Sequence, residues 1–258
     1  MNNFSSRISA IPAFSDNYIW LISGEGRACA VVDPGDHRPV LEVLEQHGLE
    51  LRHILLTHHH PDHTGGVAGL LRKYPARVHG PDDSRIRDLD ETVVEGDRVE
   101  LPELGAEFSV IEVPGHTRSH IAFHGHGVLF CGDTLFSIGC GRLFEGSAAQ
   151  MQASLDKLAD LPPETRVYCA HEYTQSNCAF ALEVEPDNAA LQTRSRQVAE
   201  ARSQGLSTIP SRLSDELAAN PFMRTREDSV VDAARKIDPQ ASPGEETMAV
   251  IRAWKDRF

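Results

Sequence analysis

The sequence contains no apolar run long enough to span a bilayer, which excludes an ordinary membrane-spanning helix. Its first seven residues lack the charged start and apolar core of a secretory signal, so we expect a cytoplasmic protein without a membrane partner. Basic residues are outnumbered by acidic ones, 25 against 38, and the formal net charge is −13. Nucleic-acid binding requires a basic surface, so this balance disfavours nucleic acid as a partner.

Cysteine is also sparse, and its spacing carries no motif. The five cysteines are scattered along the chain, and none forms a Cys-x-x-Cys pair. Such an odd, scattered set is typical of thiols in a reducing compartment and not of a disulfide framework. The sequence also lacks a serine nucleophile elbow, a phosphate-binding glycine loop and a dinucleotide fingerprint. These absences exclude three common catalytic designs.

Composition and periodicity divide the chain into two parts. With 258 residues, 40% of them hydrophobic, it has room for one large domain or two modest ones. The first part alternates short β-rich runs with helical patterns, which predicts an α/β (α+β) arrangement of two sheets with helices outside. After about Tyr173 the chain is polar and broken by prolines, which predicts a small helical domain. Strands are expected at 7–14, 18–22, 28–33, 53–57, 76–79, 108–113, 121–124, 128–131 and 166–170, and helices at 39–47, 64–73, 148–161, 188–204, 214–219 and 247–254.

The most informative segment is 57–66, which reads Thr-His-His-His-Pro-Asp-His-Thr-Gly-Gly. Four strong metal ligands, His58, His60, Asp62 and His63, fall within six residues directly after an apolar run. A strand end followed by a glycine-rich turn can direct these side chains at a common point. Imidazole and carboxylate ligands suit zinc, iron or manganese. Consecutive histidines can also be a tag or a solvated loop, but this run is internal and follows a strand with a buried character.

Three later positions have a similar setting, each beside an apolar strand. They are His116 in Pro-Gly-His-Thr, Asp133 in Cys-Gly-Asp-Thr and His171 in Ala-His-Glu-Tyr. Loops at strand ends are where a rigid scaffold presents functional groups. Taken singly each signal is weak, because an isolated histidine after a strand is more often a surface or hydrogen-bonded residue. Together with the first cluster they make seven ligands, which is enough for two metal ions.

These motifs resemble the metallo-β-lactamase-fold hydrolases, and within them the glyoxalase II family of hydroxyacylglutathione hydrolases. The pattern Thr-His-x-His-x-Asp-His-x-Gly-Gly with distal Pro-Gly-His-Thr, Gly-Asp and His indicates the superfamily. The family resemblance extends from Asn17 to the last residue and rests on segments 140–146, 171–174, 185–188, 220–224 and 252–258. It implies a metallo-β-lactamase-like αββα sandwich at residues 1–172 with a dinuclear metal centre. A helical, glutathione-binding C-terminal domain at 173–258 would follow.

The resemblance implies two divalent metal ions per chain, zinc first, with iron or manganese as alternatives. One ion is assigned to His58, His60 and His116, the second to Asp62, His63 and His171, and Asp133 bridges both. Asp62 and Asp133, with a bridging hydroxide, are the implied catalytic groups. Asp33, which precedes Pro34, resembles a carboxylate that orients the ligands. An Asp that merely forms a turn before Pro-Gly is an equally good reading of the sequence.

The resemblance assigns the glutathione contacts to Arg142, Tyr173, Arg252 and Lys255. One departure is that the family usually has lysine and tyrosine where this chain has Arg142 and Phe144. Arginine keeps the charge and can bind a carboxylate with two parallel hydrogen bonds. Phe144 cannot donate a hydrogen bond, so one substrate contact is missing or replaced. For Arg252 and Lys255, a solvated helix end that complements the helix dipole is the alternative reading.

The implied reaction is hydrolysis of S-D-lactoylglutathione to D-lactate and glutathione, the second step of methylglyoxal detoxification, by a monomer. The nearest alternative is a mononuclear iron persulfide dioxygenase of the same fold. It needs one ion, which would leave Asp62, His63 and His171 without a role. An RNA-processing phosphodiesterase is disfavoured by the acidic balance. A metal-stabilised binding module would normally use a closed, four-coordinate ligand set.

Overall fold

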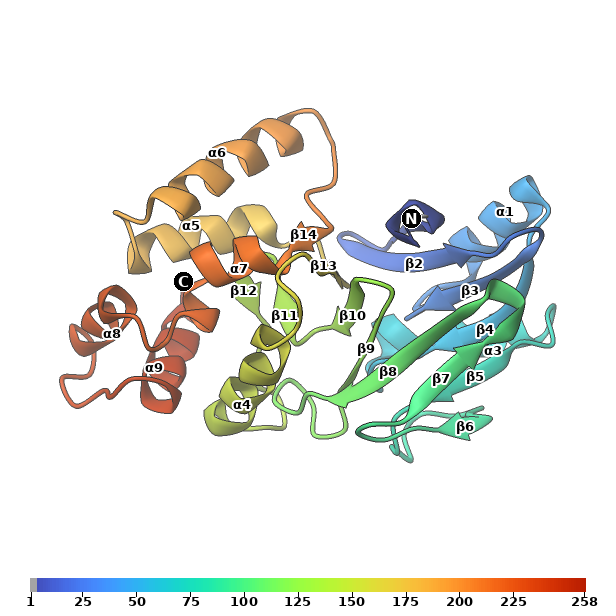
Figure 1. Ribbon diagram of the computed structural model, residues 1–258, viewed down its shortest axis with the longest axis horizontal. Helices are drawn as coiled ribbons and strands as arrows, with labels where there is room; N and C mark the ends of the chain where they lie inside the picture. The colour runs from blue at the N-terminus through green and yellow to red at the C-terminus, as the bar shows by residue number, and fades with distance from the viewer. Residues whose placement is uncertain (1–3) are drawn as a thin grey trace. The chain divides into compact units, whose positions relative to one another are not determined.

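The chain divides into two compact units in the computed structural model, which describes residues 4–258 (Figure 1). Unit 1 runs to Glu112 and includes Ser119–Gly132, whereas unit 2 comprises Val113–Arg118 and Asp133–Phe258. No helix within residues 4–258 combines the length and the apolar character that crossing a membrane requires. The prediction that the chain starts without a secretory signal concerns residues 1–3 in part, and these lie outside the described residues.

Unit 1 is built on a mixed six-stranded sheet in the order β1 to β6. Its strands are Ile8–Ala13 (β1), Asn17–Ser23 (β2), Ala28–Val32 (β3), Glu50–Leu55 (β4), Arg77–Gly80 (β5) and Glu91–Thr92 (β6). The first three pair antiparallel, and β3 to β6 pair parallel. Parallel neighbours need crossover connections. Helix α1 (His37–His47) connects β3 to β4, and helices α2 (Pro61–Thr64) and α3 (Val67–Leu71) connect β4 to β5.

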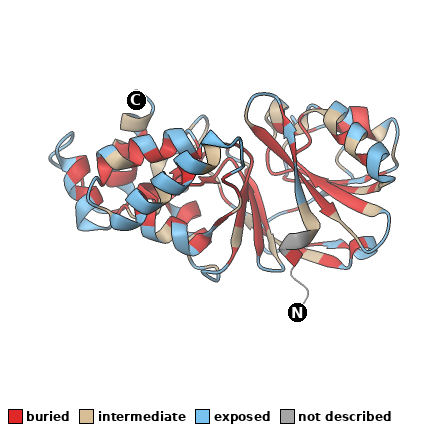
Figure 2. Cartoon of the chain, turned by 90° about the horizontal axis from the view of Figure 1, so that it is seen from above, coloured by how far each residue is buried: buried red, intermediate tan, exposed pale blue. Residues whose placement is uncertain are grey.

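The central strands of this sheet are buried on both faces, which explains their nearly continuous apolar sequences. In β2, Ile19 and Leu21 belong to a core cluster that also contains buried residues of α1 and α3. The alternate residues Trp20 and Ile22 point to the opposite face and are equally buried. Figure 2 shows the strands mostly red and the outer helix faces largely pale blue.

Four more strands of unit 1 form an antiparallel series. They are Arg98–Leu101 (β7), Ala106–Glu112 (β8), Ile121–Gly125 (β9) and Val128–Gly132 (β10). The 3₁₀ helix η2 (Pro102–Leu104) joins β7 to β8 and contacts β3, and η1 (Phe4–Arg7) precedes β1. In the first sheet Val32 lies opposite Leu55 on the parallel pair β3–β4. The segments that follow these two strands therefore leave the sheet at the same edge.

Unit 2 contains two short antiparallel strand pairs and the remaining helices. Leu135–Phe136 (β11) pairs with Gly139–Cys140 (β12), and Arg166–Cys169 (β13) pairs with Ser211–Arg212 (β14). The helices are Ala148–Ala159 (α4), Thr174–Val184 (α5), Ala189–Ser203 (α6), Leu213–Ala219 (α7), Pro221–Met223 (η3), Asp228–Arg235 (α8) and Glu245–Lys255 (α9). Helix α5 packs along α6, and α9 packs against both α4 and α8 (Figure 1).

The β11–β12 turn of unit 2 is held in place by buried polar side chains. The carboxylate of Glu216 accepts a hydrogen bond from the backbone N–H of Ile138 at 2.7 Å. Asn220 donates to two carbonyl groups of the hairpin at 3.2 and 2.9 Å. Ile138 has a φ of 59°, which is unfavourable for a β-branched residue. These bonds therefore hold a strained turn in one conformation.

Candidate functional site

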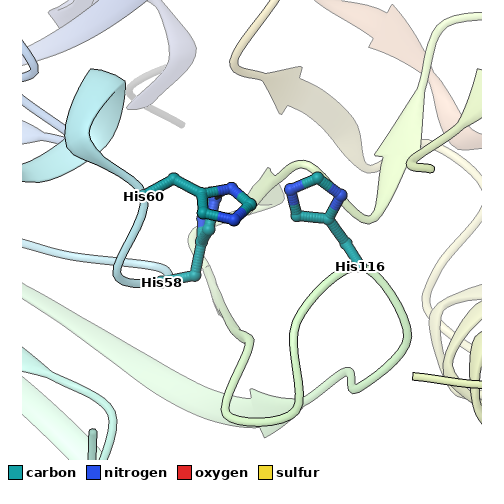
Figure 3. A group of neighbouring side chains, drawn as sticks. All are labelled: His58, His60 and His116. Atoms are coloured by element: carbon teal, nitrogen blue, oxygen red, sulfur yellow. Dashed lines mark hydrogen bonds between the residues drawn. The ribbon is translucent and has the colours of Figure 1, made fainter. Parts of the chain in front are cut away.

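The histidine motif forms the loop after β4 and the first turn of α2. His58 is buried and His60 is half-buried, and the Nε2 atom of His58 lies 3.0 Å from the Nδ1 atom of His60. Since zinc–nitrogen bonds are about 2.0–2.1 Å long, two nitrogens this close can share one ion. Figure 3 draws these two side chains together with His116, which belongs to unit 2.

Asp33 follows β3 in a left-handed conformation, with a φ of 52°. Its Oδ1 atom accepts from the Thr57 N–H at 2.8 Å, and its Oδ2 atom accepts from the Thr57 hydroxyl at 2.7 Å. The Nδ1 atom of His63 lies 3.1 Å from Oδ2. Donation from Nδ1 fixes the tautomer in which Nε2 carries the lone pair that a metal ligand needs. The geometry of Asp33 is thus compatible with both readings of the sequence, the turn and the orienting carboxylate.

Asp62 occupies the first turn of α2. Its Oδ2 atom accepts a hydrogen bond from Asn17 at 3.0 Å and lies 3.4 Å from Nε2 of His63. Sequence spacing did not identify Asn17. Its one signal is a buried polar residue at the start of an otherwise apolar strand.

Unit 2 brings two later ligand candidates, His116 and His171, close to the third, Asp133. The Nε2 atom of His116 lies 3.4 Å from Asp133 Oδ2, and that of His171 lies 3.4 Å from Oδ1. All three residues are buried. The Nδ1 atom of His116 donates to the backbone carbonyl of Arg142 at 2.8 Å, which leaves Nε2 as the lone-pair atom on the Asp133 side. A carboxylate whose two oxygens each face a different imidazole has the arrangement of a bridging ligand.

The donor chemistry of both units fits divalent metal ions. Unit 1 contributes imidazoles and one carboxylate, and unit 2 contributes two imidazoles and one carboxylate. Such nitrogen and oxygen donors suit zinc, iron or manganese, whereas metal ions that prefer thiolate ligands would need cysteine. Among the described residues, no cysteine belongs to a group able to hold a metal ion. All five cysteines are buried and form no disulfide.

A pocket of about 410 Å³ lies wholly within unit 2. Its lining includes two metal-ligand candidates and all four residues expected to contact substrate: His116, Asp133, Arg142, Tyr173, Arg252 and Lys255. Ser176 and Asn177 also line it and add polar groups that the sequence motifs did not indicate. One concave surface thus combines ligand atoms for a metal with three cationic side chains.

The three cations of the pocket differ in their surroundings. The side chain of Arg142 is 56% exposed, whereas Arg252 is only 5% exposed. The Nζ atom of Lys255 lies 5.1 Å from the centroid of the Phe180 ring. Burial, reinforced by the charge of Arg252, lowers the pKa of Lys255 to about 8. Lys255 is therefore mostly protonated at neutral pH and loses its charge under mildly alkaline conditions.

Two aromatic residues that line the pocket lie against the histidines of unit 2. Tyr173 stacks on His171, with ring centroids 4.7 Å apart and planes inclined by 7°. Phe144 is 59% exposed and meets the ring of His116 edge to face at 5.2 Å. Phe144 therefore presents apolar surface beside a ligand candidate.

The sequence matches two protein-family models and is similar to known hydroxyacylglutathione hydrolases. Residues 13–171 match the model of the metallo-beta-lactamase superfamily, and residues 172–258 match the model described as hydroxyacylglutathione hydrolase C-terminus. The hydroxyacylglutathione hydrolase of Photobacterium profundum is 53% identical over 254 residues, which cover 97% of this chain and 99% of the relative. The chain belongs to the hydroxyacylglutathione hydrolase family.

Solved structures of other proteins share the fold of this chain. ETHE1 from Myxococcus xanthus superposes with a TM-score of 0.65 at 24% identity, over 96% of this chain and 97% of that one. TTHA1623 in a di-iron-bound form gives a TM-score of 0.54 at 29% identity, over 64% of this chain and 91% of that one. The metallo-β-lactamase fold with a C-terminal helical domain, expected from the sequence, is confirmed.

Proposed function

We propose that this chain hydrolyses S-2-hydroxyacylglutathione thioesters, with S-D-lactoylglutathione giving D-lactate and glutathione in methylglyoxal detoxification. The observation that carries the proposal is the pocket of unit 2, whose lining combines His116 and Asp133 with the cations Arg142 and Lys255. A hydrolase acting on an anionic tripeptide thioester needs both kinds of group within reach of one substrate. The match to the C-terminal family model supports hydrolysis over persulfide dioxygenation.

We propose that ligands of both units together hold two divalent ions, with zinc as the first candidate. His58, His60 and His116 would hold one ion, Asp62, His63 and His171 the other, and Asp133 would serve both. Ions held in this way lower the pKa of water and polarise a carbonyl oxygen. The di-iron form of TTHA1623 supports a centre with two ions. Iron and manganese are the alternatives that metal analysis of the purified protein distinguishes.

The chain's own residues orient these groups. Asp33 accepts from Nδ1 of His63, and the carbonyl of Arg142 accepts from Nδ1 of His116, so both rings direct Nε2 outward. Asp62 and Asp133 are the carboxylates that we assign to catalysis, because each adds negative charge beside histidine nitrogens. Thiolate is a good leaving group, so the residues need not include a strong general acid.

We assign Arg142, Tyr173, Arg252 and Lys255 to recognition of the glutathione half. A chain with a net charge of −13 can bind an anionic tripeptide only where cations gather locally. The pocket provides such a place, since three of these four residues are cations. The acyl half of the substrate would then be recognised less strictly.

A series of thioesters tests the proposed substrate. Varying the acyl group on a constant glutathione should change kcat/KM by less than about tenfold. Removing both glutathione carboxylates should lower it by at least ~100-fold, because a hydrogen bond to a charged group contributes about 1.5–3 kcal/mol. Release of free thiol measures each rate. Equal kcat/KM for a simple alkyl thioester would contradict the proposal. Oxygen consumption with glutathione persulfide, at one iron per chain, would favour the dioxygenase.

Substrate binding should also weaken as the pH rises through the pKa of Lys255. A base with a pKa of about 8 is protonated below that pH and neutral above it. Its attraction for a carboxylate is therefore lost as the pH rises. If that charge is needed for binding, KM should rise roughly tenfold between pH 7 and pH 9. Lys255→Arg should keep KM flat over this range, because arginine stays charged. An equally steep rise in Lys255→Arg would show that another group titrates.

We further propose a cytoplasmic monomer with a domain boundary between residues 172 and 173. Buried thiols without disulfides support a reducing compartment. The two family models meet between residues 171 and 172, which supports the boundary. Light scattering of the purified protein tests the monomer, and expression of residues 1–172 alone tests whether that part folds by itself.

A further inference from the structure

One carboxylate in unit 2 joins two arginines of the substrate pocket. Asp256 follows the last residue of α9, and its Oδ1 atom accepts from Nε of Arg142 at 3.1 Å and from Nη2 of Arg252 at 3.0 Å. We propose that Asp256 is a positioning residue that holds Arg142 ready to bind a carboxylate of glutathione. This inference rests on the proposed function, because it assumes that Arg142 contacts the substrate.

Arg252 provides the fixed end of this arrangement. It is nearly fully buried, and its Nη1 atom donates to the backbone carbonyl of Cys140 at 2.8 Å. Its guanidinium carbon lies 5.1 Å from the centroid of the Phe222 ring. With one amino group on Cys140 and the other on Asp256, Arg252 has little freedom to reorient. Arg252 therefore fixes the carboxylate of Asp256, one helical turn further along the chain.

Arg142 is the movable end. It lies just after β12, and its side chain is 56% exposed. Packing against neighbouring residues therefore does not hold this side chain in one conformation. The contact with Asp256 uses Nε, which leaves the two terminal amino groups for another acceptor. Those amino groups form the edge with which arginine binds a carboxylate through two parallel bonds. A side chain already held in one orientation loses less conformational freedom when it binds.

The negative charge of Asp256, unlike its positioning of Arg142, would weaken the binding of an anionic substrate. A carboxylate beside the pocket repels an anionic substrate and competes with it for the same guanidinium groups. If competition dominated, removing Asp256 would tighten binding. If positioning dominates, as we infer from the fixed Arg252–Asp256–Arg142 series, removing it weakens binding. The sign of the change therefore distinguishes the two roles.

The test measures binding of S-methylglutathione, which has no thioester to hydrolyse, by calorimetry, with KM and kcat for the thioester measured alongside. Asp256→Ala should raise Kd roughly three- to tenfold, the effect of releasing one long side chain. The change should be carried by KM rather than kcat. Asp256→Asn should lie between the wild type and the Ala variant, because its amide oxygen can still accept from both arginines.

A double-mutant cycle makes the coupling to Arg142 explicit. Arg142→Ala should weaken binding, and adding Asp256→Ala to it should have no further effect, since the residue to be positioned is gone. Glu245→Ala, which removes an exposed carboxylate at the other end of α9, controls for net charge and should leave Kd unchanged.

Three results would overturn the inference. They are an unchanged or lowered Kd in Asp256→Ala, the same multiplicative effect of Asp256→Ala with and without Arg142, or an equal effect of Glu245→Ala. Wild-type protein that fails to bind S-methylglutathione at all would instead count against the proposed function. The two failures are thus distinguishable in a single set of titrations.

Discussion

Asp133→Ala is expected to lose both metal ions and at least ~10³-fold in kcat/KM. The two oxygens of Asp133 face two different histidines, His116 and His171, so a single substitution removes a ligand from both proposed ions. Metal polarisation of the reacting groups contributes several kcal/mol, and each 1.36 kcal/mol corresponds to a factor of ten in rate. Elemental analysis and thiol release measure the two effects on the same preparation.

The control for Asp133→Ala is Asp215→Ala, which removes an exposed carboxylate from α7 in the same unit. It should keep the metal content and kcat/KM of the wild type. Circular dichroism should show intact secondary structure in both variants. If Asp133→Ala retained two ions per chain, the bridging assignment would be wrong. If it lost one ion and kept the other, Asp133 would be a ligand of a single site.

Local sequence patterns predicted the elements whose signals are local. The helices expected at 148–161, 188–204 and 247–254 correspond to α4, α6 and α9. Two of these have side-chain caps at their first turn, Ser147 before α4 and Asn188 before α6. Such caps are readable from the sequence because the side-chain oxygen of the capping residue accepts from a backbone N–H group within three positions of it.

Three elements of helical structure were missed or misjudged. The helix expected at 64–73 is two shorter helices, α2 and α3, because the chain passes through Gly65 and Gly66 beside another backbone segment. A Cβ atom at Gly66 would lie 2.4 Å from the carbonyl oxygen of Pro34. Neither α5 nor α8 was predicted, although both are regular helices. Helix α5 has little helical periodicity, so packing against its neighbours stabilises it more than its own pattern does. Helix α8 is amphipathic, but its pattern extends over only eight residues.

The residues of the candidate site also divide into those with a local signal in the sequence and those without one. The motif at 57–66 was recognisable because its ligands lie within a few residues of one another. Asp133 was recognisable because it directly follows an apolar strand. Asn17 and Asp256 were assigned no role in the site, although Asn17 bonds Asp62 and Asp256 bonds Arg142. The second pair lies 114 positions apart in the sequence. Contacts at such separations depend on the whole fold, and a single sequence does not encode them in its spacing.

Gly141→Ala is expected to have nearly as large an effect as removing Asp133, without changing any ligand. A Cβ atom at Gly141 would lie 1.9 Å from the backbone oxygen of Asp133 and 3.2 Å from Cβ of His116. Neither atom is the end of a flexible side chain, so the backbone that carries Asp133 must move. A displacement of about 1 Å at a catalytic group can lower the rate ~10²-fold. We expect kcat/KM to fall by at least that factor, with partial loss of metal.

The stability of Gly141→Ala separates a local displacement from a failure to fold. Forcing an extra methyl group into a packed site typically costs about 1–3 kcal/mol, which a folded domain can survive. Gly105→Ala is the matched control, because its φ of 57° strains an alanine while no atom lies within 4 Å of the added Cβ. It should lower stability by ~1–2 kcal/mol and leave metal content and kcat/KM unchanged. Equal activity in both variants would mean that Asp133 tolerates the displacement. The absence of a side chain at position 141 would then not be what keeps Asp133 in its catalytic position.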